Sequence, residues 1–272
     1  MIKLRRQLAG FFFRQTDLTR KYWAWEIVFL FYDIIIALSV GLIGYGINSV
    51  TNLSVNSAEL TLFLVIGSFM WTYLASMFWV IGSTVQLERW EGTIEYTFMA
   101  PVKRSIQLTS TIIYAFILGI TKFLIVLVLV SFFFNISLAS VNIVSVIVIM
   151  FFSSIAFVGL GIIAATLPLL STEEGEQAVD IFEGILLFVS GIFYPITVLP
   201  EAVQLISKIS PATYALQGMR EAIINNATVS QLFSSDIMPL IVISIVLLPL
   251  SLYIFGLIEK HAKKAGKLAR TG

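Results

Sequence analysis

Six apolar stretches recur along the chain, each about as long as a helix that crosses a bilayer. They cover residues 26–47, 60–82, 109–134, 142–170, 181–199 and 237–258. A helix needs about 20 apolar residues to cross about 30 Å of hydrocarbon. Membrane strands would be about half as long and would alternate in polarity, which these stretches do not. The pattern therefore predicts an all-α integral membrane protein with six transmembrane helices over residues 26–258.

A polar segment, residues 86–104, separates the second stretch from the third. If it is helical, apolar side chains share one face and carboxylates line the neighbouring face: Leu87, Trp90, Ile94 and Phe98, then Glu88, Glu91 and Glu95. Pro101 would end this helix, because proline lacks the amide hydrogen that a helix needs. We expect an amphipathic helix at the membrane interface that either stiffens a loop or is held by a soluble partner.

Residues 199–236, between the last two stretches, form a different kind of connection. They carry too many charges to span a bilayer, yet they are too apolar for a solvated loop. Apolar residues recur at helical spacing before and after Ser210-Pro211, which predicts a re-entrant hairpin of two short helices. The alternative is a lid that only packs on the outer ends of the helices.

The two ends of the chain are basic. Residues 1–25 place three phenylalanines and a tryptophan among arginines, as expected for an interfacial helix, and residues 259–272 form a basic tail. Fourteen of the 17 lysines and arginines fall in these two ends and in residues 86–104. Because such residues gather on the cytoplasmic side, we expect a multi-pass protein of the plasma membrane with both termini in the cytoplasm.

The composition of the chain excludes some kinds of partner and site. The chain of 272 residues is 58% hydrophobic and 12% charged, its net charge is +1, and it has no cysteine and one histidine. A charge this small argues against a nucleic-acid partner, and the absent thiols exclude disulfides and thiolate metal sites. We expect no catalytic residues and no metal site in this chain.

A few residues inside the apolar stretches stand out. Asp33 and Lys122 place charges within the membrane, where they either pair or line a pathway. Gly191 and Pro195 interrupt the fifth stretch on either side of Tyr194, so a kink there could act as a gate. These five are the candidate pathway residues.

The run ERWEGTIEYTFMAP resembles the cytoplasmic coupling segment of the ABC type-2 permease family. The matching positions are Glu88, Arg89, Glu91, Gly92, Thr93, Glu95, Ala100 and Pro101. The run SGIFYPITVLPEAVQLISKISPATYALQGMREAI is similar to the fifth span and re-entrant segment of that family, with Pro195, Pro200, Pro211, Tyr214 and Arg220 as the matching positions. Together with the six-span layout and the basic tail, the resemblance covers essentially the whole chain.

This resemblance implies the membrane permease subunit of an ATP-driven exporter. A separate ATP-binding-cassette subunit, which would carry the ATP and Mg²⁺, would dock on the coupling segment through Glu88, Arg89, Trp90, Glu91, Gly92, Thr93, Glu95 and Pro101. In the outer hairpin the implied residues are Pro211, Tyr214 and Arg220. A second permease chain would complete the pathway, with a homodimer favoured, and the cargo would be lipid-like, drug-like or a glycan.

Two other functions stay open at this point. An ion-coupled secondary transporter would normally show an internal repeat or paired intramembrane charges, and the chain shows no convincing repeat. A membrane scaffold or insertion factor needs no coupling segment. The chain has no G-x-x-x-x-G-K-[ST] phosphate loop, so we expect any ATP hydrolysis to take place on a partner.

Overall fold

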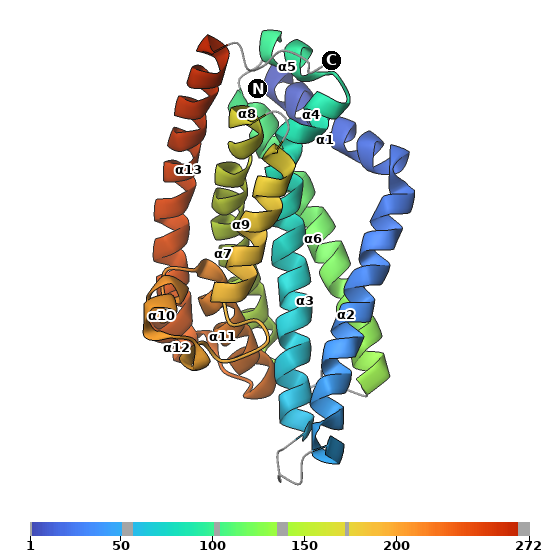
Figure 1. Cartoon of the computed structure of the whole chain (residues 1–272), viewed down its shortest axis with the longest axis vertical. Helices are drawn as coiled ribbons and strands as arrows, with labels where there is room; N and C mark the ends of the chain where they lie inside the picture. Colours follow the sequence, from blue (N-terminus) through green and yellow to red (C-terminus); the bar gives the residue numbers. More distant parts are fainter. Residues whose placement is uncertain (1, 51–56, 101–103, 135–140, 172–173, 266–272) are drawn as a thin grey trace.

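The structure, a computed structural model of the chain, describes residues 2–50, 57–100, 104–134, 141–171 and 174–265 (Figure 1). All of the regular elements in this part of the chain are helices. The start of α1 (Ile2–Lys21), the end of α13 (Met238–Lys264) and α5 (Ile94–Met99) lie at the same end of the elongated bundle, which we call the terminal end. The all-α prediction is therefore confirmed.

Five helices in the described part of the chain are long and apolar enough to cross a membrane. Their main helices are α2 (Trp23–Val50), α3 (Ser57–Gly82), α6 (Arg104–Phe134), α7 (Ile143–Ala164) and α13 (Met238–Lys264). The candidate span on α7 continues to Leu170, and the one on α13 begins at Val229. Helix α3 is the most buried of the five and packs against α2, α6, α7 and α11. It runs from the terminal end to the opposite end and so touches both regions described below.

Aromatic rings fill the contact between α3 and α6. The Phe123 ring on α6 meets the rings of Phe69 and Tyr73 on α3 in edge-on geometry, with centroids 5.3 and 5.9 Å apart. Much of the apolar surface of α2 and α13 is exposed instead, which suits helices that face lipid. The polar–apolar pattern thus separates a protein core around α3 from a lipid-facing exterior.

The prediction of one helix over residues 181–199 is wrong. Helix α9 covers Gly175–Val189, so it begins earlier and is about 22 Å long at 1.5 Å per residue. Gly191 follows with φ +69°, a left-handed conformation that ends the helix, and a 3-10 turn, η1, covers Ile196–Val198. The chain therefore turns at residues 190–195, where a kinked helix was expected.

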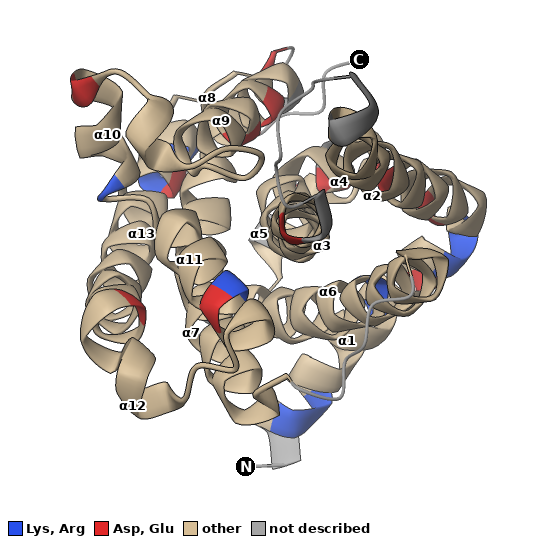
Figure 2. Cartoon of the chain, turned by 90° about the horizontal axis from the view of Figure 1, so that it is seen from below, with Lys and Arg blue, Asp and Glu red and all other residues tan. Residues whose placement is uncertain are grey.

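Short helices occupy the two ends of the bundle. At the terminal end lie α1 (Ile2–Lys21), α4 (Thr84–Trp90), α5 (Ile94–Met99) and α8 (Leu167–Leu170). Residues 199–236 form α10 (Glu201–Ser207), α11 (Pro211–Ile224), α12 (Val229–Leu232) and most of a π-helical turn, η2 (Phe233–Ile237). Seen from the opposite end, α10, α11 and α12 lie on one side of α3, and α2 and α6 lie on the other (Figure 2).

Candidate functional site

The segment predicted as one amphipathic helix consists of two short helices, α4 and α5. Gly92 breaks them apart with φ +67°, and the Thr93 amide donates to the Glu88 carbonyl oxygen at 2.9 Å to close the turn. Glycine adopts this left-handed conformation at little cost, whereas other residues resist it. Because of the break, the face assignments of a single continuous helix do not hold.

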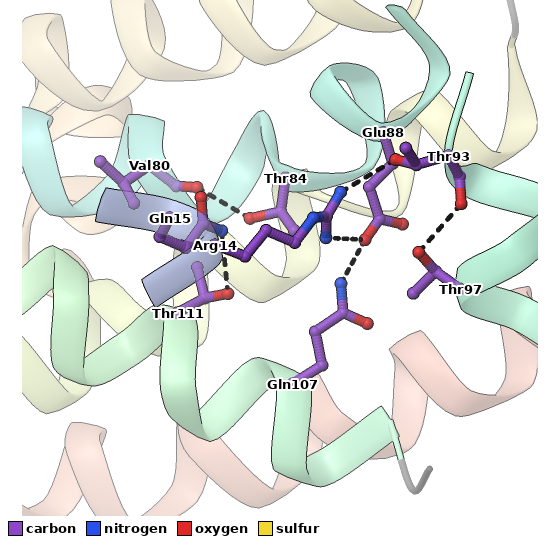
Figure 3. A network of polar contacts seen from close by, with 9 residues as sticks. All are labelled: Arg14, Gln15, Val80, Thr84, Glu88, Thr93, Thr97, Gln107 and Thr111. Carbon is purple, nitrogen blue, oxygen red and sulfur yellow. Dashed lines mark hydrogen bonds and ion pairs between the residues drawn. The ribbon is translucent and has the colours of Figure 1, made fainter. Parts of the chain in front are cut away.

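Glu88 lies in the interior and is only 1% exposed. Its Oε1 atom accepts a hydrogen bond from Arg14 Nη1 at 2.9 Å and another from Gln107 Nε2 (Figure 3). The second guanidinium nitrogen of Arg14 donates to Thr93 Oγ1 at 2.9 Å. This cluster ties α4 and the start of α5 to α1 and α6. The predicted polar face of Glu88, Glu91 and Glu95 is therefore wrong for Glu88, since a buried ion pair holds this residue.

Glu91 also contacts the end of α1. It accepts a hydrogen bond from the Tyr22 hydroxyl at 2.6 Å and forms an ion pair with Lys21 Nζ at 3.0 Å. The hydrogen bond from Tyr22, and then that from Lys21, lowers the pKa of Glu91 below its usual range, and the pKa of Lys21 is raised in turn. Glu91 therefore fastens the loop to α1 and does not offer a free carboxylate.

A compact outward surface remains on this loop. Trp90, Tyr96 and Met99 are 60%, 73% and 72% exposed, and Glu95 is exposed beside them. Ile94 is fully buried and anchors α5, whereas Trp90 lies mostly exposed. Pro101 lies outside the described residues, as do the side chains of Arg89 and Phe98. We call Trp90, Glu95, Tyr96 and Met99 the loop surface.

The intramembrane charges have a different arrangement. Lys122 on α6 forms an ion pair with Glu26 near the start of α2, with Nζ and Oε2 2.9 Å apart. Asp33, two turns further along α2, is half-buried and forms no ion pair within the described residues. The sequence left open a pair between Lys122 and Asp33, whereas the structure joins Lys122 to Glu26.

At the opposite end, three predicted residues from distant parts of the sequence line one cavity of about 740 Å³: Gly191, Pro195 and Arg220. Arg220 donates to the carbonyl oxygens of Gly191 at 3.2 Å, Ile192 at 2.5 Å and Phe63 at 3.3 Å. Its guanidinium carbon also lies 3.5 Å from the centroid of the Phe63 ring. Arg220 thus fixes the turn after α9 against α3.

The other predicted residues of this end bond within their own segments. The Tyr194 hydroxyl donates to the Phe188 carbonyl oxygen at 2.6 Å, and the Tyr214 hydroxyl donates to that of Lys208 at 2.8 Å. Pro211 is the first residue of α11, a position where its missing amide hydrogen is not needed. These three residues shape the turns around the cavity but do not line it.

Sequence reasoning missed three residues that hold these regions together. Arg14 and Gln107 bind Glu88, and Gly67 on α3 faces the turn after α9. A Cβ atom at Gly67 would collide with the Ile192 carbonyl oxygen, so only glycine permits this approach. The only available sequence signal for Arg14 was its basic side chain on the N-terminal helix, and no sequence pattern points to Gln107 or Gly67.

Comparison with known proteins gives the family of the chain. The family model for ABC-2 type transporters matches residues 7–224, from α1 to the end of α11. No curated protein matches the chain. The family match covers most of the five long helices, both short helices of the 84–99 loop and the turn held by Arg220. The chain therefore belongs to the ABC-2 type transporter family.

Proposed function

We propose that this chain is the permease subunit of an ATP-driven exporter and that a separate ATP-binding subunit docks on the loop surface. Family membership supports a membrane transport subunit that associates with an ATP-binding partner. The observation that carries the docking position is the exposure of Trp90, Tyr96 and Met99 on a loop that is otherwise firmly bonded. Large exposed apolar side chains grouped with polar ones are typical of protein interaction sites.

The hydrogen bonds and ion pairs around the loop would transmit its movement to the neighbouring helices. A partner that pushes on α5 would move α4 with it, and Arg14 and Gln107 would carry that movement to α1 and α6 through Glu88. Lys21 and Tyr22 would carry it to the start of α2 through Glu91. Because buried charge-assisted hydrogen bonds are strong, the loop and these helices would move together.

The rest of the proposed assembly follows from this arrangement. The terminal end would face the cytoplasm of a plasma membrane, and two identical permease chains would enclose the pathway. ATP and Mg²⁺ would bind the partner subunit, and the cargo would be lipid-like, drug-like or a glycan. The ion-coupled alternative has less support, because Glu26 already neutralises the intramembrane Lys122.

Co-purification tests the docking surface. We would tag the chain in its native cells, solubilise it gently and measure by mass spectrometry how much ATP-binding-cassette subunit comes with it. The double variant Tyr96→Ala/Met99→Ala should lose that subunit. The matched control is Val198→Ala/Ile209→Ala, which truncates two equally exposed residues (73% each) elsewhere and should retain it.

Two results would contradict the proposal. One is a folded, abundant wild-type chain that brings no ATP-binding-cassette subunit. The other is equal recovery of that subunit by both double variants. If the subunit is recovered as expected, stimulation of its ATPase activity by candidate cargo is the next assay, since an exporter hydrolyses ATP faster when cargo is present.

A further inference from the structure

The cavity at the opposite end is lined by elements that are far apart in the sequence. They are the start of α3, the turn after α9, the second half of α11, and the segment from α12 into η2. Its volume of about 740 Å³ falls within the range of pockets that hold small organic molecules. No part of the proposed docking at the terminal end involves this cavity.

Asp236 on η2 lines the cavity and is only 5% exposed. Its Oδ2 atom accepts a hydrogen bond from the neighbouring Ser235 hydroxyl at 2.5 Å. Within the described residues, no ion pair joins this carboxyl group to a cationic side chain. Burying a carboxylate without a cation is unfavourable, so this position is suited to a positively charged ligand.

Arg220 lines the same cavity but does not neutralise Asp236. All three of its side-chain nitrogens donate to backbone carbonyl oxygens, and its flat face lies on the Phe63 ring. Two more carboxylates line the wall, Glu59 on α3 and Glu221 on α11. Even without Glu59, the carboxylates Glu221 and Asp236 outnumber the cationic side chain of the lining, Arg220, which favours a cation over an anion.

Local structure explains how Asp236 reaches this position. It belongs to the π-helical turn η2, and such turns redirect side chains and are frequent at functional sites. Helix α11 packs closely against it, because a Cβ atom on Gly218 would lie 3.3 Å from the Asp236 Cβ atom. A larger residue at 218 would push the two elements apart, so the approach depends on this glycine.

An organic cation fits the lining better than a metal ion. No group of three histidine, cysteine or carboxylate residues in the described ranges is close enough to hold a metal. Neutral amides, Gln217, Asn225 and Gln231, also line the wall. Asn225 Nδ2 already donates to Glu221 and Gln231 Oε1 already accepts from the Thr228 amide, so Asn225 Oδ1, Gln231 Nε2 and the Gln217 amide are the groups that can bind the polar body of a larger molecule. We propose that this cavity binds an organic cation, with an ammonium group on Asp236 and the polar part of the molecule against these amides.

Calorimetric titration of the purified full-length chain with spermidine, a linear molecule with three ammonium groups, tests this site. Saturable binding is expected. Asp236→Asn keeps the shape and removes the charge, so it should weaken spermidine binding about tenfold or more, as expected for a lost charge-assisted hydrogen bond. Glu221→Gln, at the exposed rim, should weaken it less, and the matched control Glu201→Gln on α10, outside the cavity, should not change it.

Three results would overturn the proposal. The first is that spermidine shows no saturable binding, and the second is that Asp236→Asn and Glu221→Gln both bind spermidine as tightly as wild type does. The third is that Mg²⁺ displaces spermidine at similar concentrations. Gel filtration checks that each variant is folded. If Asp236→Asn fails that check, Glu221→Gln decides the matter. The titration needs neither ATP nor a partner, so a negative result would not contradict the proposed docking of an ATP-binding subunit. A negative co-purification result would likewise not contradict the cation site.

Discussion

The two ends of the molecule use carboxylates in opposite ways. At the terminal end, Glu88 and Glu91 are held in ion pairs by Arg14 and Lys21 from another helix. At the opposite end, Asp236 is buried like Glu88 but has no cationic partner in the described structure, and the nearby Arg220 bonds to carbonyl oxygens. The first arrangement fastens helices together, whereas the second leaves a charge directed into a cavity.

This difference separates two kinds of function. A loop that must transmit force needs bonds that are complete before a partner arrives, and the Glu88 cluster provides them. A ligand site needs groups whose interactions are incomplete until the ligand binds, as around Asp236. If the comparison is right, substitutions at the terminal end should change stability and coupling, and substitutions in the cavity should change binding.

Replacing Arg14 tests whether the Glu88 cluster fastens the loop to α1 and α6. Of the substitutions proposed, we expect this one to lower stability most. Arg14→Met leaves Glu88 buried without its cation, which should lower the free energy of unfolding by about 3 kcal/mol. Unfolding in SDS, followed by tryptophan fluorescence, measures this loss. The control is Lys263→Met, which removes an exposed ion pair with Glu259 on α13 and should cost about 0.5 kcal/mol or less.

The double variant Arg14→Met/Glu88→Met sharpens the result. Because no charge is then left buried, it should be more stable than Arg14→Met alone. Equal stability of Arg14→Met and the Lys263→Met control would show that the Glu88 cluster does not fasten the loop.

Gly67 tests the packing that closes the opposite end. Gly67→Ala places a methyl group against the Ile192 carbonyl oxygen and near the Arg220 guanidinium, so α3 and the turn after α9 must move apart. We expect a loss of about 2 kcal/mol in the same SDS assay, the usual cost of overpacking. Gly184→Ala on α9, where nothing lies within 4 Å, should cost little, and equal losses in the two variants would refute the contact.

Sequence patterns predicted the long helices because each depends on local composition. The end of α9 was missed for the opposite reason: apolar residues continue past Val189, so hydropathy alone gives no stop signal there. The stop is set by the left-handed backbone at Gly191 and by Arg220, which lies 29 residues away. Hydropathy therefore locates apolar segments better than it locates their ends.

In the coupling segment, too, the local sequence pattern did not show where single side chains lie. A helical projection placed Glu88 beside Glu91 on an outward face, because it assumed a continuous helix through Gly92. It also could not reveal that Arg14, 74 residues earlier in the chain, lies against Glu88. The positions of these side chains therefore depended on tertiary contacts that a helical projection does not contain.

Gly191→Ala should have a smaller effect than Gly67→Ala. An alanine at φ +69° costs about 1 kcal/mol in backbone energy, and its methyl group also crowds the Ile196 side chain. The SDS assay measures the loss in stability, and spermidine titration of the same variant should show weaker binding because Gly191 lines the cavity. A variant as stable as wild type would show that the turn after α9 is not fixed in this conformation.

Glu91 offers the smallest and most specific test, which depends on pH. Because its pKa is lowered in the folded protein, chiefly by the Tyr22 hydroxyl and then by Lys21, its ionised form stabilises the fold. That contribution is fully present above the ordinary glutamate pKa of about 4.3 and is lost as the pH falls through the lowered value. Wild type should therefore be more stable than Glu91→Gln at pH 7, and the gap should close in stronger acid.

Tyr22→Phe should reduce the same gap at pH 7, since it removes the hydrogen bond that lowers the pKa of Glu91 most. Glu201→Gln, on the other hand, changes an exposed carboxyl group elsewhere and should show no comparable gap at either pH. If the gap between wild type and Glu91→Gln persisted unchanged into strong acid, ionised Glu91 would not be what fastens the loop to α1. The buried contact between Arg14 and Glu88 would then be the ion pair that holds the loop to α1.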